Sequence, residues 1–161
     1  MRASELQIAD LMFIRGNRLL DLPVKMITQS KYTHVAGYCG TGLVIEAQGL
    51  RATGLEALST YKGVVDVYRH PYLTETQKQD IMAFVHEEVG GRYDYLLLGW
   101  EAVRHIFGVF LPHLKSKRRI CSTLWADAYK SAAGVDLCPQ HTYPTPNDLA
   151  KSAYLKKVGT Y

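Results

Sequence analysis

Several features are missing from this 161-residue sequence, and each absence removes a class of protein. No run of about 18 apolar residues occurs, so no segment is predicted to span a membrane. The first residues lack the apolar core of a signal peptide, so we expect a cytoplasmic product, with export or association with a particle left open. No glycine-rich phosphate loop is present, because Gly37, Gly40 and Gly42 fall within a predicted hairpin.

Cysteine is scarce, with Cys39, Cys121 and Cys138 as the three residues and no C-x-x-C pair among them. This odd count argues against a disulfide framework and against a cysteine zinc site, and a reducing compartment is the simplest expectation. His105 and His113 have no acidic partner at the spacing of metal ligands. The sequence therefore predicts no metal and no organic cofactor.

Basic residues only slightly outnumber acidic residues, and the net charge is +4 at pH 7. The clustered basic residues form one short run at 115–119, which falls short of the basic surface that nucleic-acid binding requires. A hydrophobic content of 47% and a charged content of 21% are typical of a folded globular chain. We expect a single domain over residues 1–161, without repeats.

The pattern of apolar residues predicts an α+β domain. Expected strands cover residues 10–15, 33–38, 43–47, 64–69 and 154–158. Expected helices cover residues 95–110, 121–133, a single turn at 147–150, and a segment from the Thr74 cap, with Gln77 completing a capping box, to Gly90. Short strands in sequence order favour a small, mainly antiparallel sheet packed against helices.

The predicted hairpin brings a histidine and a glutamate together. If residues 39–41 form a three-residue loop, paired residue numbers add to 80 and His34 lies opposite Glu46 on the same face. A two-residue loop would move this pairing by one place. The hypothesis therefore depends on the length of the loop.

Cys121 is predicted to lie at the start of the helix over residues 121–133, which Gly134 ends. Free N–H groups and the positive end of the helix dipole stabilise a thiolate there. Lys117, Arg118 and Arg119 come just before it and would act in the same direction. A small buried cysteine without reactivity is the alternative interpretation.

These residues supply the parts of a cysteine nucleophile site. Cys121 offers the thiol, His34 the base, and Glu46 a carboxylate that orients the imidazole. The Cys121 N–H and the Tyr93 hydroxyl are candidate donors to an oxyanion. Further candidates for substrate binding, from their positions beside Cys121, are Ser122 and Arg119. Each residue alone also has a structural interpretation: His34 as a core histidine, Tyr93 as packing, and the basic run as a solvated loop.

Seven short motifs then occur in a distinctive order. They are Asp-Leu-Met-Phe-Ile-Arg-Gly (10–16), Tyr-Thr-His-Val-Ala-Gly-Tyr (32–38), Val-Ile-Glu-Ala (44–47), Asp-Val-Tyr-Arg (66–69), Gly-Arg-Tyr-Asp-Tyr (91–95), Ile-Cys-Ser-Thr-Leu (120–124) and Thr-Pro-Asn-Asp-Leu (145–149). This order resembles the circularly permuted branch of the NlpC-type papain-like cysteine hydrolases, the YiiX/YaeF-like permuted amidases. The histidine hairpin comes before the cysteine helix in that branch, as it does in this chain.

The resemblance implies roles for particular residues. Cys121 matches the nucleophile, His34 the base and Glu46 the third polar residue, while Tyr93 matches a tyrosine of less certain role. The strand before the hairpin usually begins Gly-Asp in the family, and this chain has Ala9 instead of the glycine. Relatives include cell-wall peptide hydrolases and acyltransferases of the lecithin:retinol type. The latter use an Asn-Cys-Glu-His signature and typically a histidine as the third residue, which this chain lacks.

The resemblance therefore favours hydrolysis of an amide bond in a peptide or cell-wall peptide, through an acyl-enzyme and without a cofactor. A thioesterase or lipid acyltransferase with the same triad is the first alternative. The second is a papain-like module that binds a partner within a larger assembly and has no activity.

Overall fold

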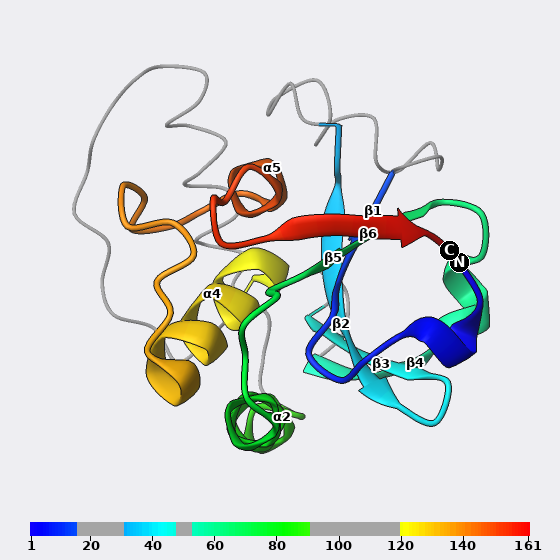
Figure 1. Cartoon of the computed structure of the whole chain (residues 1–161), viewed down its shortest axis with the longest axis horizontal. Coiled ribbons are helices and arrows are strands. Elements are labelled where there is room, and N and C mark those ends of the chain that lie inside the picture. Colours follow the sequence, from blue (N-terminus) through cyan, green and yellow to red (C-terminus); the bar gives the residue numbers. More distant parts are fainter. Residues whose placement is uncertain (16–30, 48–52, 91–119) are drawn as a thin grey trace.

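The computed structural model describes residues 1–15, 31–47, 53–90 and 120–161, and the remaining residues are drawn as a grey trace in Figure 1. Within the described ranges, six strands form one antiparallel sheet in the order β4-β3-β2-β1-β5-β6. The strands are β1 (Leu11–Ile14), β2 (His34–Gly40), β3 (Leu43–Ala47), β4 (Thr53–Ala57), β5 (Val65–Arg69) and β6 (Lys156–Thr160). The α-helices are α2 (Glu75–Glu87), α4 (Cys121–Ala133) and α5 (Pro146–Ala150), and the 3-10 turns are η1 (Ala3–Glu5) and η3 (Leu58–Tyr61).

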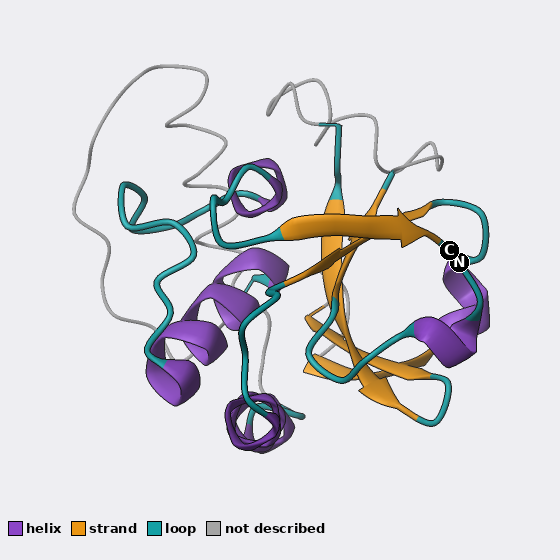
Figure 2. Ribbon diagram, in the orientation of Figure 1, coloured by secondary structure: helices purple, strands orange, loops and turns teal. Residues whose placement is uncertain are grey.

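The sheet curls strongly, and the three α-helices lie to one side of it (Figure 2). Side chains alternate along each strand, so β1 contributes to two separate apolar cores. Leu11 and Phe13 pack with the helices, whereas Met12 and Ile14 pack on the inner side of the curl. Both faces of this strand are therefore buried, which explains its continuous apolar sequence.

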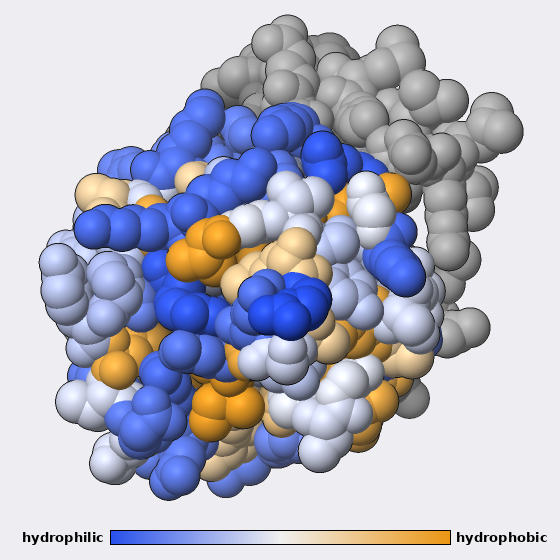
Figure 3. All heavy atoms as spheres, turned by 45° about the vertical axis from the view of Figure 1, so that its right-hand side comes forward, coloured by the Kyte–Doolittle hydropathy of each residue, from blue (hydrophilic) through white to orange (hydrophobic). Residues whose placement is uncertain are grey.

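The surface is mixed in character. On the face shown in Figure 3, apolar groups are small and are separated by charged and polar residues. Among the described residues, no helix is both long enough and apolar enough to cross a membrane.

Most of the predicted elements are confirmed. The Thr74–Gln77 capping box begins α2, and Gly134 ends α4 in the left-handed conformation with φ of 71°. The antiparallel sheet and the α+β class are confirmed as well, while β6 lies two residues further along the chain than expected. Strand β4 and turn η3 were not predicted, and the helix expected over 95–110 lies outside the described residues.

The hairpin register differs from the prediction. Gly37 pairs with Ile45 and Tyr38 with Val44, so paired residue numbers add to 82 rather than 80. The turn between the strands contains only Thr41 and Gly42, both with positive φ (53° and 75°), as a type I′ turn requires. The expectations of a three-residue loop and of His34 directly opposite Glu46 were therefore wrong.

A bulge at the end of β2 nevertheless keeps these two side chains on one face. The turn pairs Gly40 with Leu43, and continuing from that pair without interruption would place His34 and Glu46 on opposite faces. The register instead shifts by one residue between Tyr38 and Gly40. Glu46 consequently lies diagonally across from His34, within reach of a long side chain.

Helix α4 packs directly on β2 because one residue there has no side chain. A Cβ atom added at Gly37 would lie 2.1 Å from the ring of Trp125, far inside any van der Waals contact. Trp125 is fully buried at this contact. The fit between Gly37 and Trp125 sets how closely α4 approaches the strand that carries His34.

Candidate active site

Cys121 is the first residue of α4, as the sequence predicted, and is 6% exposed. Ile120 precedes it in an extended conformation and provides no side-chain cap for the helix. The Thr123 hydroxyl is bonded to the backbone of Ile120 at 3.1 Å. Because the Ile120 side chain does not bond to the first-turn N–H groups, it does not compete for them with a negative charge at Cys121.

His34 is held by a carboxylate from the neighbouring strand. Its Nε2 atom lies 2.7 Å from Oε2 of Glu46, and the Glu46 side chain is only 3% exposed. The hydroxyl of Tyr61 donates to the same oxygen at 2.5 Å. Since Nε2 is occupied in this way, Nδ1 is the ring nitrogen left to face the sulfur.

Cys121 and His34 alter each other's ionisation. Burial alone would lower the pKa of His34, but the Cys121 thiolate, a hydrogen bond to it, and the Glu46 carboxylate raise the pKa above its usual value. Burial alone would raise the pKa of Cys121, but the His34 cation and the N–H groups of Val35 and Ser122 lower it. The geometry therefore favours a thiolate–imidazolium pair.

The other predicted site residues have different positions. Ser122 is fully buried, and its hydroxyl has no hydrogen-bond partner among the residues that the structure describes. Its contribution to the site is the backbone N–H beside the sulfur. Tyr93 and Arg119 lie outside the described residues, as do Lys117 and Arg118. The structure therefore brings together Cys121, His34 and Glu46.

Reasoning from the sequence missed two contributors to this arrangement. Tyr61, which donates to Glu46, lies on η3, and that turn was not predicted. The N–H of Val35 is a backbone group, and no side-chain pattern identifies such a donor. The side chain of Val35 is apolar, and nothing in it indicates that the amide beside it faces the Cys121 sulfur.

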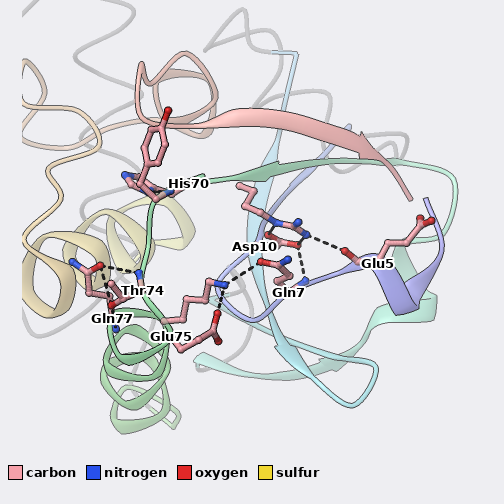
Figure 4. Close-up of polar contacts among 10 residues, drawn as sticks. Glu5, Gln7, Asp10, His70, Thr74, Glu75 and Gln77 are labelled. Carbon is pink, nitrogen blue, oxygen red and sulfur yellow. Dashed lines mark hydrogen bonds and ion pairs between the residues drawn. The ribbon is translucent and has the colours of Figure 1, made fainter.

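The segment before β1 is held in a conformation unusual for its residue. Ala9 has φ of 66°, in the left-handed region that favours glycine. Its carbonyl accepts a hydrogen bond from Tyr129 of α4 at 2.6 Å. Asp10, which Figure 4 shows next to Gln7 and Glu5, accepts two bonds from Arg69, at 2.6 and 2.7 Å. These bonds hold the backbone around Ala9 in this conformation.

Together, the fold and the site define a class of protein. A cysteine at the start of a buried helix faces a histidine on an antiparallel sheet, and the histidine strand comes first in the chain. This is a papain-like cysteine hydrolase with permuted topology. Residues 6–158 match the permuted papain-like amidases of the YaeF/YiiX type, family C92, and the chain belongs to that family.

One solved structure supports the fold independently. The chain is similar to the metalloprotein YiiX from Escherichia coli O157:H7, with a TM-score of 0.75 and 17% sequence identity over 96% of this chain and 97% of that one. None of the functionally curated proteins with which the chain was compared is significantly similar to it.

The name of that structure raises the question of a metal site in this chain. Within residues 1–15, 31–47, 53–90 and 120–161, no three His, Cys, Asp or Glu side chains are grouped so that they could hold a metal ion. These residues therefore do not fit a metal centre.

Proposed function

We propose that Cys121, His34 and Glu46 form the catalytic triad of an amidase that acts on a peptide-type substrate. The observation that carries this proposal is the chain of contacts from the Cys121 sulfur through His34 to Glu46, with a lowered pKa at the thiol. Family membership makes the protein a cysteine hydrolase of the amidase type. The triad assigns that chemistry to particular atoms.

In the proposed acylation step, the Cys121 thiolate attacks the carbonyl carbon of the amide and forms a tetrahedral intermediate. The backbone N–H of Cys121 donates to the oxyanion, with the Tyr93 hydroxyl as the proposed second donor. The His34 imidazolium then gives its proton to the leaving amine, and the C–N bond breaks. A thioester on Cys121 and a free amine result.

In the second step, His34 takes a proton from water, and the resulting hydroxide attacks the thioester carbonyl. The C–S bond breaks and releases the carboxylic acid and the Cys121 thiolate. His34 retains the proton it took from water, so the thiolate–imidazolium pair is restored. Glu46 keeps the Nε2–H of His34 pointed toward itself in both steps, so that Nδ1 exchanges the proton. Tyr61 in turn fixes the carboxylate.

The substrate class is proposed from the family, and cell-wall peptides are the first group to test. Matched substrates with the same acyl group, one a p-nitroanilide and one a p-nitrophenyl ester, separate amide from ester chemistry. We expect turnover of both, a transient acyl adduct on Cys121 by intact mass, and loss of both in Cys121→Ala. Cys138→Ala removes a buried cysteine that lies outside the triad and is the matched control.

Two results would count against the proposal in different ways. Turnover of the ester alone, with acyl transfer to added amines, would favour the thioesterase or acyltransferase alternative. A wild-type enzyme that forms no adduct on Cys121 with either substrate would favour a module without activity.

A further inference from the structure

We propose that two neighbouring turns, at 70–73 and 151–155, form a surface that binds the protein to an anionic lipid membrane. The inference goes beyond the proposed function and does not depend on it, because neither turn contains a residue of the triad. We call this surface the two-turn patch. Its exposed residues are Pro71, Tyr72, Lys151, Ala153, Tyr154 and Lys156.

His70 brings the two turns together. The centre of its ring lies 6.3 Å from the ring centre of Tyr72 and 6.3 Å from that of Tyr154. The ring of Tyr154 is nearly parallel to that of His70, at 12°, whereas the ring of Tyr72 meets it edge-on, at 84°. Figure 4 shows His70 where the chain leaves β5 on its way to α2. Two segments that are distant in the sequence therefore form one surface.

The tyrosines of the patch are left outside the core. Tyr72 is 79% exposed, the largest fraction of any large apolar side chain among the described residues, and Tyr154 is 49% exposed. Each follows a smaller apolar residue that is also exposed, Pro71 in the first turn and Ala153 in the second. Leu155, directly after Tyr154, is by contrast buried in the core. Contiguous apolar groups left on a surface mark sites of interaction with a partner or a membrane.

Both turns are held in place by side chains. The N–H of Tyr72 donates to Nδ1 of His70 at 3.2 Å, and the N–H of Tyr154 donates to Oγ of Ser152 at 3.3 Å. Burial lowers the pKa of His70, so its ring is uncharged at neutral pH and remains an acceptor for Tyr72. Because the turns are already ordered, binding costs little conformational entropy.

The patch also carries positive charge. Residues 69–74 and 150–161 contain no Asp and no Glu. Lys151 and Lys156 are exposed, and among the described residues neither takes part in an ion pair. An anionic surface would therefore be attracted to these two ammonium groups.

The acidic residues that flank the patch already have partners. Glu75, which follows the first turn, lies 2.7 Å from Nζ of Lys78. Asp148, which precedes the second turn, accepts a hydrogen bond from the N–H of Thr145 at 2.8 Å. Neither carboxylate is bonded to a lysine of the patch, so the patch keeps its positive charge.

A membrane suits this surface better than a protein does. A stable protein–protein interface takes roughly 20–30 residues from each partner, far more than the patch supplies. Tyrosine, with an apolar ring and a polar hydroxyl, is enriched where lipid headgroups meet the hydrocarbon. Lysine side chains cover apolar surface with their stems while the ammonium group reaches anionic headgroups. The composition of the patch matches both requirements.

The patch lies far from the nucleophile. Helix α4 begins at Cys121, has 13 residues and is about 20 Å long. At its other end, the carbonyl of Ala133 accepts a hydrogen bond from Nε2 of Gln77 at 3.1 Å. Gln77 in turn is bonded to Thr74, the residue directly after the first turn. Binding through the patch would therefore leave Cys121 uncovered.

Co-sedimentation of the full chain with lipid vesicles tests the inference. The vesicles are phosphatidylcholine with about 30 mol% phosphatidylglycerol, and pure phosphatidylcholine vesicles are the comparison. We expect the wild-type partition coefficient to be higher on the anionic vesicles by about tenfold or more, because two lysines approach the charged surface. It should fall as salt is raised from about 0.1 M to about 1 M and the Debye length shortens.

Single variants of exposed residues locate the binding surface. Tyr72→Ser should lower the partition coefficient on anionic vesicles by about fivefold, for the loss of ~40 Å² of buried apolar surface. Lys156→Gln should lower it by about fivefold as well. Two matched controls should leave it unchanged. Leu55→Ser removes an exposed apolar residue from β4, at the opposite edge of the sheet from β6, and Lys62→Gln removes an exposed lysine outside the patch.

Three results would overturn the inference: no wild-type binding to the anionic vesicles, equal binding to both kinds of vesicle, or equal losses in the patch variants and the controls. A dimer that forms with rising concentration and that Tyr72→Ser dissociates, without vesicle binding, would also overturn it and identify a second copy of the chain as the partner. Iodoacetamide labelling of Cys121 should be the same in all four variants. Slow labelling in the wild type would contradict the proposed function alone, because vesicle binding does not involve Cys121.

Discussion

At the scale of single residues, the site depends on one histidine held between a sulfur and a carboxylate. Glu46 is buried, and its position is fixed by the Tyr61 hydroxyl at 2.5 Å. A buried carboxylate of this kind requires partners that keep it charged. His34 is one of these partners. Because the Glu46 carboxylate accepts a hydrogen bond from Nε2, the imidazole carries its proton on Nε2.

Glu46→Gln should therefore impair activity more than stability. The amide retains an oxygen that can accept from Nε2, but it loses the charge that raises the pKa of His34. We expect kcat/KM to fall by roughly 10²-fold, in the range of general acid–base contributions. The measurement is turnover of an amide substrate together with the unfolding free energy.

Two variants complete this prediction. Tyr61→Phe keeps the carboxylate charge and should cause a smaller loss of activity, with a stability cost of about 1–3 kcal/mol for a lost bond to a charged group. Glu87→Gln, on an exposed turn of α2, should change neither quantity. Full activity in Glu46→Gln would show that the carboxylate does not support the base.

At the scale of elements, the geometry of the proposed triad depends on how α4 packs against β2. Because Gly37 has no side chain, the Trp125 ring of the helix packs directly against the backbone of the strand. Cys121 begins that helix, and His34 begins that strand. A change at Gly37 is therefore expected to alter the distance between Cys121 and His34, although Gly37 is not one of those two residues.

Gly37→Ala should lower the unfolding free energy by about 1–3 kcal/mol, because the new methyl group overlaps the Trp125 ring. It should also slow alkylation of Cys121, since α4 must move away from His34. Chemical denaturation and the labelling rate are the two measurements. The double variant with Trp125→Phe makes room for the methyl group and should recover part of both losses. No recovery would show that the Trp125 contact is not the cause.

The hairpin shows what the sequence could and could not predict. The two strands of the hairpin and the common face of His34 and Glu46 followed from alternation. The register was not predicted. The two-residue turn alone would place His34 and Glu46 on opposite faces, and the bulge near Cys39 returns them to the same face. A bulge is one extra residue in a strand, and composition does not mark its position.

The same limit applies to contacts that are distant in sequence. Strand β4 and Tyr61 were missed because alternation in Thr53–Ala57 is weak, with a polar and a glycine residue on the inner positions. The grouping of Arg15, Lys31 and Lys157 on Asp66 joins four separate segments, and only the folded sheet order brings them together.

At the scale of the whole molecule, the Asp66 cluster connects β1, β5, β6 and the residues that lead into β2. Burial alone would raise the pKa of Asp66, but hydrogen bonds from Lys157, Tyr32 and Lys31 hold it well below its usual range. A carboxyl group with a depressed pKa stabilises the fold above its unfolded pKa, about 3.9. That stabilisation is lost as the pH falls through the folded pKa.

Wild-type stability should therefore decline as the pH falls below about 4, and Asp66→Asn should flatten part of that decline. At pH 7 the variant should be less stable by about 3 kcal/mol, because three cations lose their shared counter-charge. Urea denaturation from pH 7 to pH 2 measures both quantities. An unchanged slope in Asp66→Asn would show that Asp66 does not contribute to the acid sensitivity.

The pH dependence of alkylation at Cys121 shows whether Cys121 and His34 form a thiolate–imidazolium pair. Because the pKa of Cys121 is lowered and that of His34 is raised, the charged pair exists between those two values. The iodoacetamide rate at Cys121, followed by peptide mass spectrometry, should titrate well below the ordinary thiol pKa of about 8.5. In His34→Ala the titration should move up toward that value, while labelling at Cys39 should be unchanged. A wild-type profile that already follows an ordinary thiol, and that His34→Ala leaves in place, would contradict the account.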